Sequence, residues 1–150
     1  STQSRSSAAS DVYKRQHHVA LEARQPNLEG AGGISLARLV RESLRMRPDR
    51  LVVGECRGEE VRELLTALNT GHDGGAGTLH ASGLSDVPAR LEALGALASM
   101  DATALARQAV SAFTIVLHLD RAPGGRRRIA QAGVLALTGD RLGIEEVRPW

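Results

Sequence analysis

Short apolar runs alternate with stretches of helical spacing along the chain. Four apolar runs have the length and composition of strands: 19–23, 51–53, 77–81 and 114–119. Four other stretches repeat apolar residues three or four positions apart, as on one face of a helix: 36–44, 59–70, 85–99 and 102–112. This alternation favours an α/β fold with a mostly parallel sheet flanked by helices.

Capping residues support the helix boundaries. Ser35, Ser85 and Asp101 each precede a predicted helix and are good N-cap residues, and Gly71 follows the second helix as its C′ residue. Near the C-terminus, turns at 123–125 and 138–140 separate runs 128–137 and 142–147. These runs predict an antiparallel C-terminal hairpin that completes the sheet.

Composition is that of one globular domain. The chain has 150 residues, of which 42% are hydrophobic and 24% charged. No apolar run approaches the roughly 18 residues that a membrane-spanning helix needs. The single cysteine, Cys56, excludes an internal disulfide and any multi-cysteine metal site.

Residues 1–16 differ from the rest of the chain. This segment is rich in serine, has no periodicity and contains Lys14, the only lysine beside 18 arginines. We expect 1–16 to be foreign or disordered and 17–150 to form the domain. Three of the 19 basic and one of the 17 acidic residues lie in 1–16, so 17–150 is charge-balanced. A balanced domain gives no reason to expect a nucleic-acid partner.

The first candidate for chemistry follows the apolar strand at 51–53. Gly54 and Glu55 place a carboxylate at the carboxyl end of this strand, where open α/β sheets bind ligands. Nucleotide hydrolases use such an acid, the Walker B acid, to hold the Mg²⁺ shell or orient the attacking water. The alternative is a solvated glutamate at a strand end. Arg57 follows two residues later, and we interpret Cys56 as a small packed side chain.

The second candidate is the glycine-rich loop after the second helix. His72 and His80 bracket this loop, where an imidazole can contact a phosphate. A second possibility is a metal site of His72, Asp73 and His80, but this spacing matches no standard zinc site. A third possibility is a turn in which Asp73 and the glycines only set the backbone geometry. The loop is not a phosphate-binding P-loop, because no Gly-Lys pair of the Walker A type occurs in the 150 residues.

A third charged feature is the run Arg126–Arg128 beside the turn at 123–125. We interpret it as a solvated hairpin end. A membrane-surface or nucleic-acid role is the alternative.

From residue 17 onward the chain resembles the C-terminal half of the secretion-superfamily ATPases, the motors of type II and type IV secretion and of type IV pili. Four stretches carry the resemblance: LEARQPNLEG (21–30), LRMRPDRLVVGECRGEE (44–60), LNTGHDGGAGTLHAS (68–82) and ARLEALGAL (89–97). The pilus-assembly branch called Tad/CpaF is the most similar. The resemblance implies part of a RecA-like P-loop NTPase core.

The resemblance also implies roles for individual residues. Glu55 matches the Walker B glutamate, which activates the attacking water and belongs to the Mg²⁺ shell, possibly through a water molecule. His80 matches the γ-phosphate contact. Four further positions are implied in nucleotide binding: Arg57, Gly71, His72 and Thr78.

For the whole protein, the resemblance implies ATP and Mg²⁺ as cofactors and a homo-hexamer on the cytoplasmic face of the inner membrane. Its partner would be a pilus or secretion platform protein. Because Walker A is absent, we expect this chain to be inactive alone and marginally stable. The alternatives are a non-catalytic ring or scaffold module of the same fold and, less favoured, a nucleic-acid translocase.

Overall fold

A computed structural model describes residues 17–72 and 74–148, so the predicted segment 1–16 and Asp73 lie outside the described residues. The α-helices are α2 (Leu36–Ser43), α3 (Glu60–Asn69), α4 (Val87–Leu97) and α5 (Ala102–Ala112). Short 3₁₀ turns are η1 (Leu44–Met46) and η2 (Leu84–Asp86). The strands are β1 (Val52–Val53), β2 (Ala76–Gly77), β3 (Val116–Arg121), β4 (Arg127–Thr138) and β5 (Arg141–Val147).

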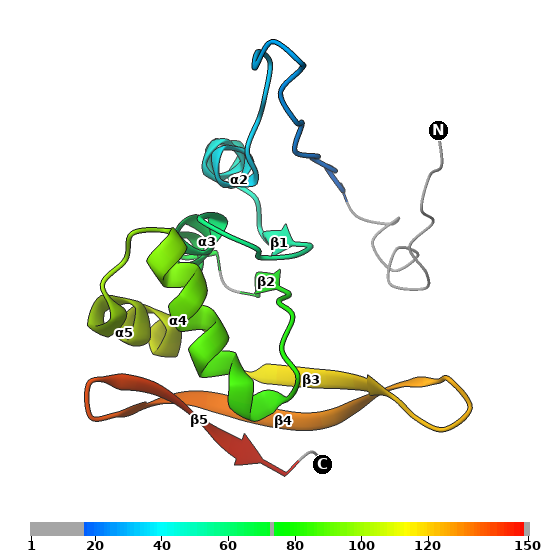
Figure 1. Cartoon of the computed structure of the whole chain (residues 1–150), viewed down its shortest axis with the longest axis vertical. Helices are drawn as coiled ribbons and strands as arrows, with labels where there is room; N and C mark the ends of the chain where they lie inside the picture. The colour runs from blue at the N-terminus through cyan, green and yellow to red at the C-terminus, as the bar shows by residue number, and fades with distance from the viewer. Residues whose placement is uncertain (1–16, 73, 149–150) are drawn as a thin grey trace.

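The strands form two separate sheets (Figure 1). β1 pairs in parallel with β2, whereas β3, β4 and β5 form an antiparallel meander in that order. The mixed α/β class is confirmed. The placement of run 114–119 in the parallel sheet is wrong, because a turn of a few residues joins β3 to β4 and such a turn permits only antiparallel pairing. The C-terminal hairpin, β4 with β5, forms as predicted, but it pairs with β3 in a separate sheet and does not complete the parallel one.

The core lies between the helices and the inner face of the meander. Helices α3, α4 and α5 bury Leu64, Leu94 and Leu105 almost completely, and Leu135 of β4 and Leu142 of β5 join the same cluster. Burial of aliphatic side chains is the main stabilising term. As the scarcity of aromatic residues requires, this core is almost entirely aliphatic.

Two strand predictions need correction. Run 19–23 is irregular, and among residues 17–72 and 74–148 the pairing next to it is an isolated bridge between Arg24 and Ile34. Val19 and Leu21 are about half exposed, so their side chains gain little burial that would stabilise a paired strand there. Within the run at 77–81, only Gly77 lies in a strand, because β2 spans Ala76–Gly77.

The wholly apolar run 51–53 predicts a strand buried on both faces, as in a parallel sheet, but the strand is buried on one face only. Val53 is 2% exposed, but Val52 is 57% exposed. Alternate side chains of a strand point to opposite faces, and only the Val53 side is packed against α3 and α4.

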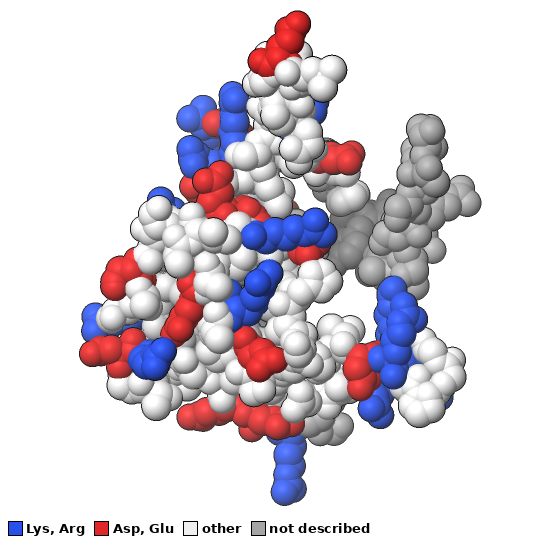
Figure 2. All heavy atoms as spheres, in the orientation of Figure 1, with Lys and Arg blue, Asp and Glu red and all other residues white. Residues whose placement is uncertain are grey.

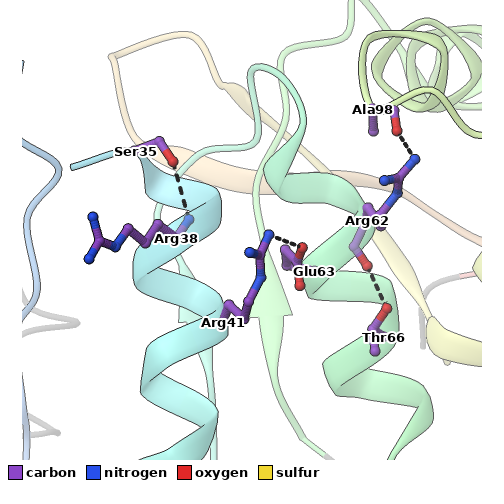
Figure 3. Close-up of polar contacts among 7 residues, drawn as sticks. All are labelled: Ser35, Arg38, Arg41, Arg62, Glu63, Thr66 and Ala98. Carbon is purple, nitrogen blue, oxygen red and sulfur yellow. Dashed lines mark hydrogen bonds and ion pairs between the residues drawn. The ribbon is translucent and has the colours of Figure 1, made fainter. Parts of the chain in front are cut away.

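Helix caps follow the sequence in three of four cases. The Ser35 hydroxyl accepts from the Arg38 amide (Figure 3), and the Asp101 carboxylate accepts from the Thr103 amide. Gly71 has φ +96° directly after the C-cap Thr70, as a C′ glycine requires. Ser85 does not cap α4, because it lies inside the turn η2 and the helix starts after Asp86.

Polar contacts connect α3 to its neighbours (Figure 3). Arg41 of α2 pairs with Glu63 of α3 at 2.8 Å between Nη2 and Oε1. The adjacent residue, Arg62, donates to the carbonyl of Ala98 just after α4. These contacts help to fix α3, the helix that follows the first candidate loop.

Candidate functional site

Glu55 lies two residues beyond β1, and a guanidinium and an imidazole contact its carboxylate. Arg57 Nη2 is 2.5 Å from Glu55 Oε2, and His80 Nε2 is 2.9 Å from Glu55 Oε1. The Glu55 side chain is 24% exposed, whereas those of Arg57 and His80 are 76% and 83% exposed. His80 and Arg57, which the sequence places 23 positions apart, therefore share the Glu55 carboxylate at an open surface.

The electrostatics of this cluster favour ionised Glu55. The hydrogen bond from Arg57 is the largest influence and lowers the pKa of the Glu55 carboxyl, with partial burial acting against it. The charges of Arg57, His80 and Arg90 lower the Glu55 pKa further. The same contact raises the pKa of the Arg57 guanidinium. Glu55 is thus a carboxylate at neutral pH.

Backbone hydrogen bonds beyond the ends of strands β1 and β2 explain why His80 reaches Glu55. Beyond the short β1–β2 ladder, the Cys56 amide donates to the Thr78 carbonyl at 2.7 Å. The Thr78 hydroxyl donates to the Gly54 carbonyl. These bonds continue the alignment of the two segments past the last paired strand residues, and His80 follows two residues later beside Glu55.

Glu60 holds the loop that carries Glu55 and Arg57, and the sequence analysis gave it no site role. Its carboxylate accepts from the amides of Arg57 and Gly58, the latter at 2.9 Å, and the residue is only 6% exposed. It lies in the first turn of α3, where an anion also interacts favourably with the helix dipole. An acid just inside a helix that follows a glycine is the signal from which this role was predictable.

Cys56 packs into the core beneath the cluster. It is 4% exposed, and burial raises the pKa of its thiol to about 12. A Cβ added at Gly77 would lie 2.7 Å from Leu64 Cδ2 and 3.5 Å from Cys56 Sγ, so the glycine permits this close packing. The interpretation of Cys56 as a small packed side chain is confirmed.

Gly71 and His72 lie apart from Glu55 in their contacts. They follow the C-terminus of α3, and His72 Nδ1 is 3.2 Å from the Ala67 carbonyl within that helix end. The structure therefore brings together Glu55, Arg57 and His80, places Thr78 against their backbone, and leaves Gly71 and His72 at the helix terminus.

The described residues hold no ready-made metal cage at this site. Across 17–72 and 74–148, no three His, Cys, Asp or Glu side chains gather to hold a metal ion. Glu55 borders neither of two surface hollows, of about 130 and 430 Å³. A lone carboxylate suits Mg²⁺, which keeps several waters and takes its other oxygens from phosphates.

A scan against protein-family models matches residues 17–136 to the family described as type II/IV secretion system protein. The chain belongs to the type II/IV secretion system protein family. The match includes the Glu55 cluster, the glycine loop and helices α2 to α5. In the part of this family member that the structure describes, no helix is long and apolar enough to cross a membrane.

Curated relatives of this family member are named for conjugal transfer. A putative conjugal transfer protein of Mycobacterium tuberculosis is 50% identical over 143 residues, which are 95% of this chain and 40% of that protein. Conjugal transfer protein TrbB of Rhizobium radiobacter is 36% identical over 67% of the chain and 31% of its own length. Protein VirB11 of the same organism is 38% identical over 46% of the chain and 20% of its own length. The chain thus spans less than half the length of these relatives.

Proposed function

We propose that the Glu55 cluster belongs to the ATP-hydrolysing site of a secretion motor. The observation that carries this proposal is the meeting of His80 and Arg57 on the two oxygens of Glu55. An ionised acid at a strand end, with a guanidinium and an imidazole beside it, suits a site where water attacks a phosphate and negative charge develops. Family membership supports the same chemistry.

Each residue has a role in this proposal. Glu55 orients the attacking water and accepts its proton, and it joins the Mg²⁺ shell through a water. His80 and Arg57 contact the γ-phosphate and neutralise its charge. Thr78 fixes the loop by its bond to Gly54, and Gly71 with His72 completes the nucleotide-binding loop. Mg²⁺, when bound, shields the phosphate charge.

We further propose the assembly that the sequence resemblance implies. The whole protein forms a RecA-like homo-hexamer at the cytoplasmic side of the inner membrane, where ATP hydrolysis acts on a secretion or pilus platform protein. The curated relatives are named for conjugal transfer, which favours a type IV secretion machine. Sequence resemblance alone supports the pilus-assembly branch.

The test uses a chimera, because this chain covers 40% of the M. tuberculosis relative. The chain replaces the matching segment of that relative, and ATP hydrolysis is measured by phosphate release. We expect turnover in the chimera, loss of turnover with retained nucleotide binding in Glu55→Gln, and strongly slowed turnover in His80→Ala. Arg45→Gln, an exposed change outside the cluster, serves as the control.

Two outcomes contradict the proposal. Full turnover in Glu55→Gln would show that this carboxylate does not activate water. A chimera that binds nucleotide but never hydrolyses it, beside an active relative, would favour the non-catalytic ring or scaffold module.

A further inference from the structure

The backbone on each side of His80 is fixed to another part of the chain. Before it, Thr78 is hydrogen-bonded to the segment that carries Glu55. After it, residues 81–83 have no regular structure and lead into the turn η2. The His80 side chain is 83% exposed, so little packing of its own holds it in place. The position of His80 beside Glu55 therefore depends on the backbone before and after it.

Leu84, the first residue of η2, is seated on the C-terminal meander. It is 3% exposed, and η2 contacts all three strands β3, β4 and β5. A Cβ added at Gly133 of β4 would lie 2.8 Å from Leu84 Cδ2, so the leucine packs directly against the backbone of this strand. Leu84 follows His80 by four residues, and this contact fixes the chain on the far side of His80.

Gln131 of β4 connects the same turn to the meander by a hydrogen bond. The Leu84 amide donates to Gln131 Oε1 at 3.4 Å, and Gln131 Nε2 lies 3.5 Å from both carboxylate oxygens of Glu146 on β5. The reversed side-chain amide would place a donor against the Leu84 N–H and an oxygen against a carboxylate, so these two neighbours set its orientation. Acidic side chains lie along the edge of the molecule at β5 (Figure 2). Gln131 thus connects the turn after His80 to two strands of the meander.

We propose that Gln131 is a positioning residue for His80. Its bond to the Leu84 amide fixes the end of the segment that follows His80, as the bonds of Thr78 fix the end that precedes it. A shift of the meander relative to β1 therefore moves His80 relative to the Glu55 carboxylate. The meander in this way controls the Glu55 cluster without adding a side chain to it. The effect on ATP hydrolysis rests on the proposed function, whereas the positioning of His80 does not.

The first test uses the chain itself and needs no nucleotide. Gln131→Met keeps the length of the side chain and removes both polar ends, and Gln108→Met on α5 is the matched control. Hydrogen exchange of the Leu84 amide should become about fivefold faster in Gln131→Met, as for the loss of one hydrogen bond, and stay unchanged in the control. Circular dichroism checks folding. If the methionine variant does not fold, Gln131→Asn replaces it, because its shorter side chain withdraws the oxygen from the Leu84 amide.

A second measurement reports on His80 directly. In the parent chain, Glu55→Gln should change the NMR chemical shifts of the His80 ring, because the two side chains are in contact. This response should be largely lost in the Gln131→Met background. The double variant Gln131→Glu/Glu146→Gln should restore it, because the exchange conserves net charge, keeps a donor and an acceptor in this pair and leaves an oxygen for the Leu84 amide.

A third measurement places Gln131→Met in the chimera and follows phosphate release. We expect kcat to fall by up to about fivefold, the factor expected for the exchange rate, and the double variant Gln131→Glu/Glu146→Gln to recover it. Because Gln131 acts through His80, its substitution should add little to the effect of His80→Ala. A general loss of stability would instead slow turnover by the same factor with and without His80→Ala.

Three results would show that Gln131 does not position His80. The first is an unchanged exchange rate of the Leu84 amide in Gln131→Met, and the second is an unchanged response of His80 to Glu55→Gln in that background. The third is an equal loss of turnover with and without His80→Ala. If His80→Ala alone leaves turnover unchanged, the proposed function of His80 fails, and the exchange and NMR measurements still decide whether Gln131 positions this residue.

Discussion

Glu60 offers the sharpest test of how the Glu55 loop is held. Its carboxylate is buried and accepts from the backbone amides of Arg57 and Gly58. Glu60→Ala removes the carboxylate and with it two hydrogen bonds to a charged group. Each such bond contributes about 1.5 kcal/mol to stability, the low end of the usual range, because water can reach the exposed loop. We therefore expect Glu60→Ala to lower the free energy of unfolding by about 3 kcal/mol.

The matched control is the neighbouring glutamate. Glu59 precedes α3, is exposed and makes no capping hydrogen bond. Glu59→Ala should change the free energy of unfolding by less than about 0.5 kcal/mol. Glu60→Gln keeps an oxygen acceptor but loses the charge, so its loss should be intermediate, about 1 kcal/mol.

Urea denaturation followed by circular dichroism measures these differences. With a slope of about 2 kcal/mol per molar, Glu60→Ala should lower the midpoint by about 1.5 M. Amide hydrogen exchange adds a local measurement, in which the Arg57 and Gly58 amides should lose protection in Glu60→Ala and keep part of it in Glu60→Gln. Equal midpoints for Glu59→Ala and Glu60→Ala, with unchanged exchange at both amides, would refute the reasoning.

Three further predictions concern the core, the glycine loop and nucleotide. The pKa of the Cys56 thiol in the folded protein, about 12, lies above its ordinary value. The stability that the neutral thiol contributes is therefore complete below about pH 9 and is lost as the pH rises toward 12. Urea unfolding midpoints across this pH range test the direction of the change, and midpoints that do not vary with pH would contradict it. Gly75→Ala should destabilise the protein by about 1–3 kcal/mol, because its Cβ would lie 2.8 Å from the Leu51 carbonyl oxygen. The control is Gly54→Ala, whose Cβ would meet nothing within 4 Å and should change stability little. Thermal melting compares the two variants, and equal melting temperatures would refute the packing argument. Finally, titration of a fluorescent ATP analogue with Mg²⁺ should show no saturable binding to this chain, and saturable binding would mean that the glycine loop grips phosphate without Walker A.

The helices were predictable because periodicity and capping agree. Ala102–Ala112 was predicted residue for residue, since Asp101 caps it and small apolar residues repeat on one face. The start of α4 was not, because a 3₁₀ turn at Leu84–Asp86 precedes it and local composition does not distinguish the two kinds of turn.

Strand pairing was the weaker part of the prediction. A short apolar run indicates that a segment is buried, but it does not indicate which strand pairs with that segment. For this reason 114–119 was assigned to the wrong sheet. The sequence predicted that Glu55 follows a strand and that His80 follows a glycine loop, but it did not predict their contact. That contact depends on the hydrogen bonds of Thr78 with Cys56 and Gly54. The sequence marks Glu60 as an acid at the start of a helix, but the same signal fits a solvated residue, so its burial and its bonds to the Arg57 and Gly58 amides were not predicted.

The division into two sheets has a kinetic consequence. The meander is built from the contiguous residues 116–147 through two short turns, so its pairings close small loops and form early. The parallel pair of β1 and β2 joins only two residues from each strand and must wait until α3 has crossed between them. We therefore expect the segment that carries Glu55 to reach its native arrangement last during folding and to open first in native-state exchange.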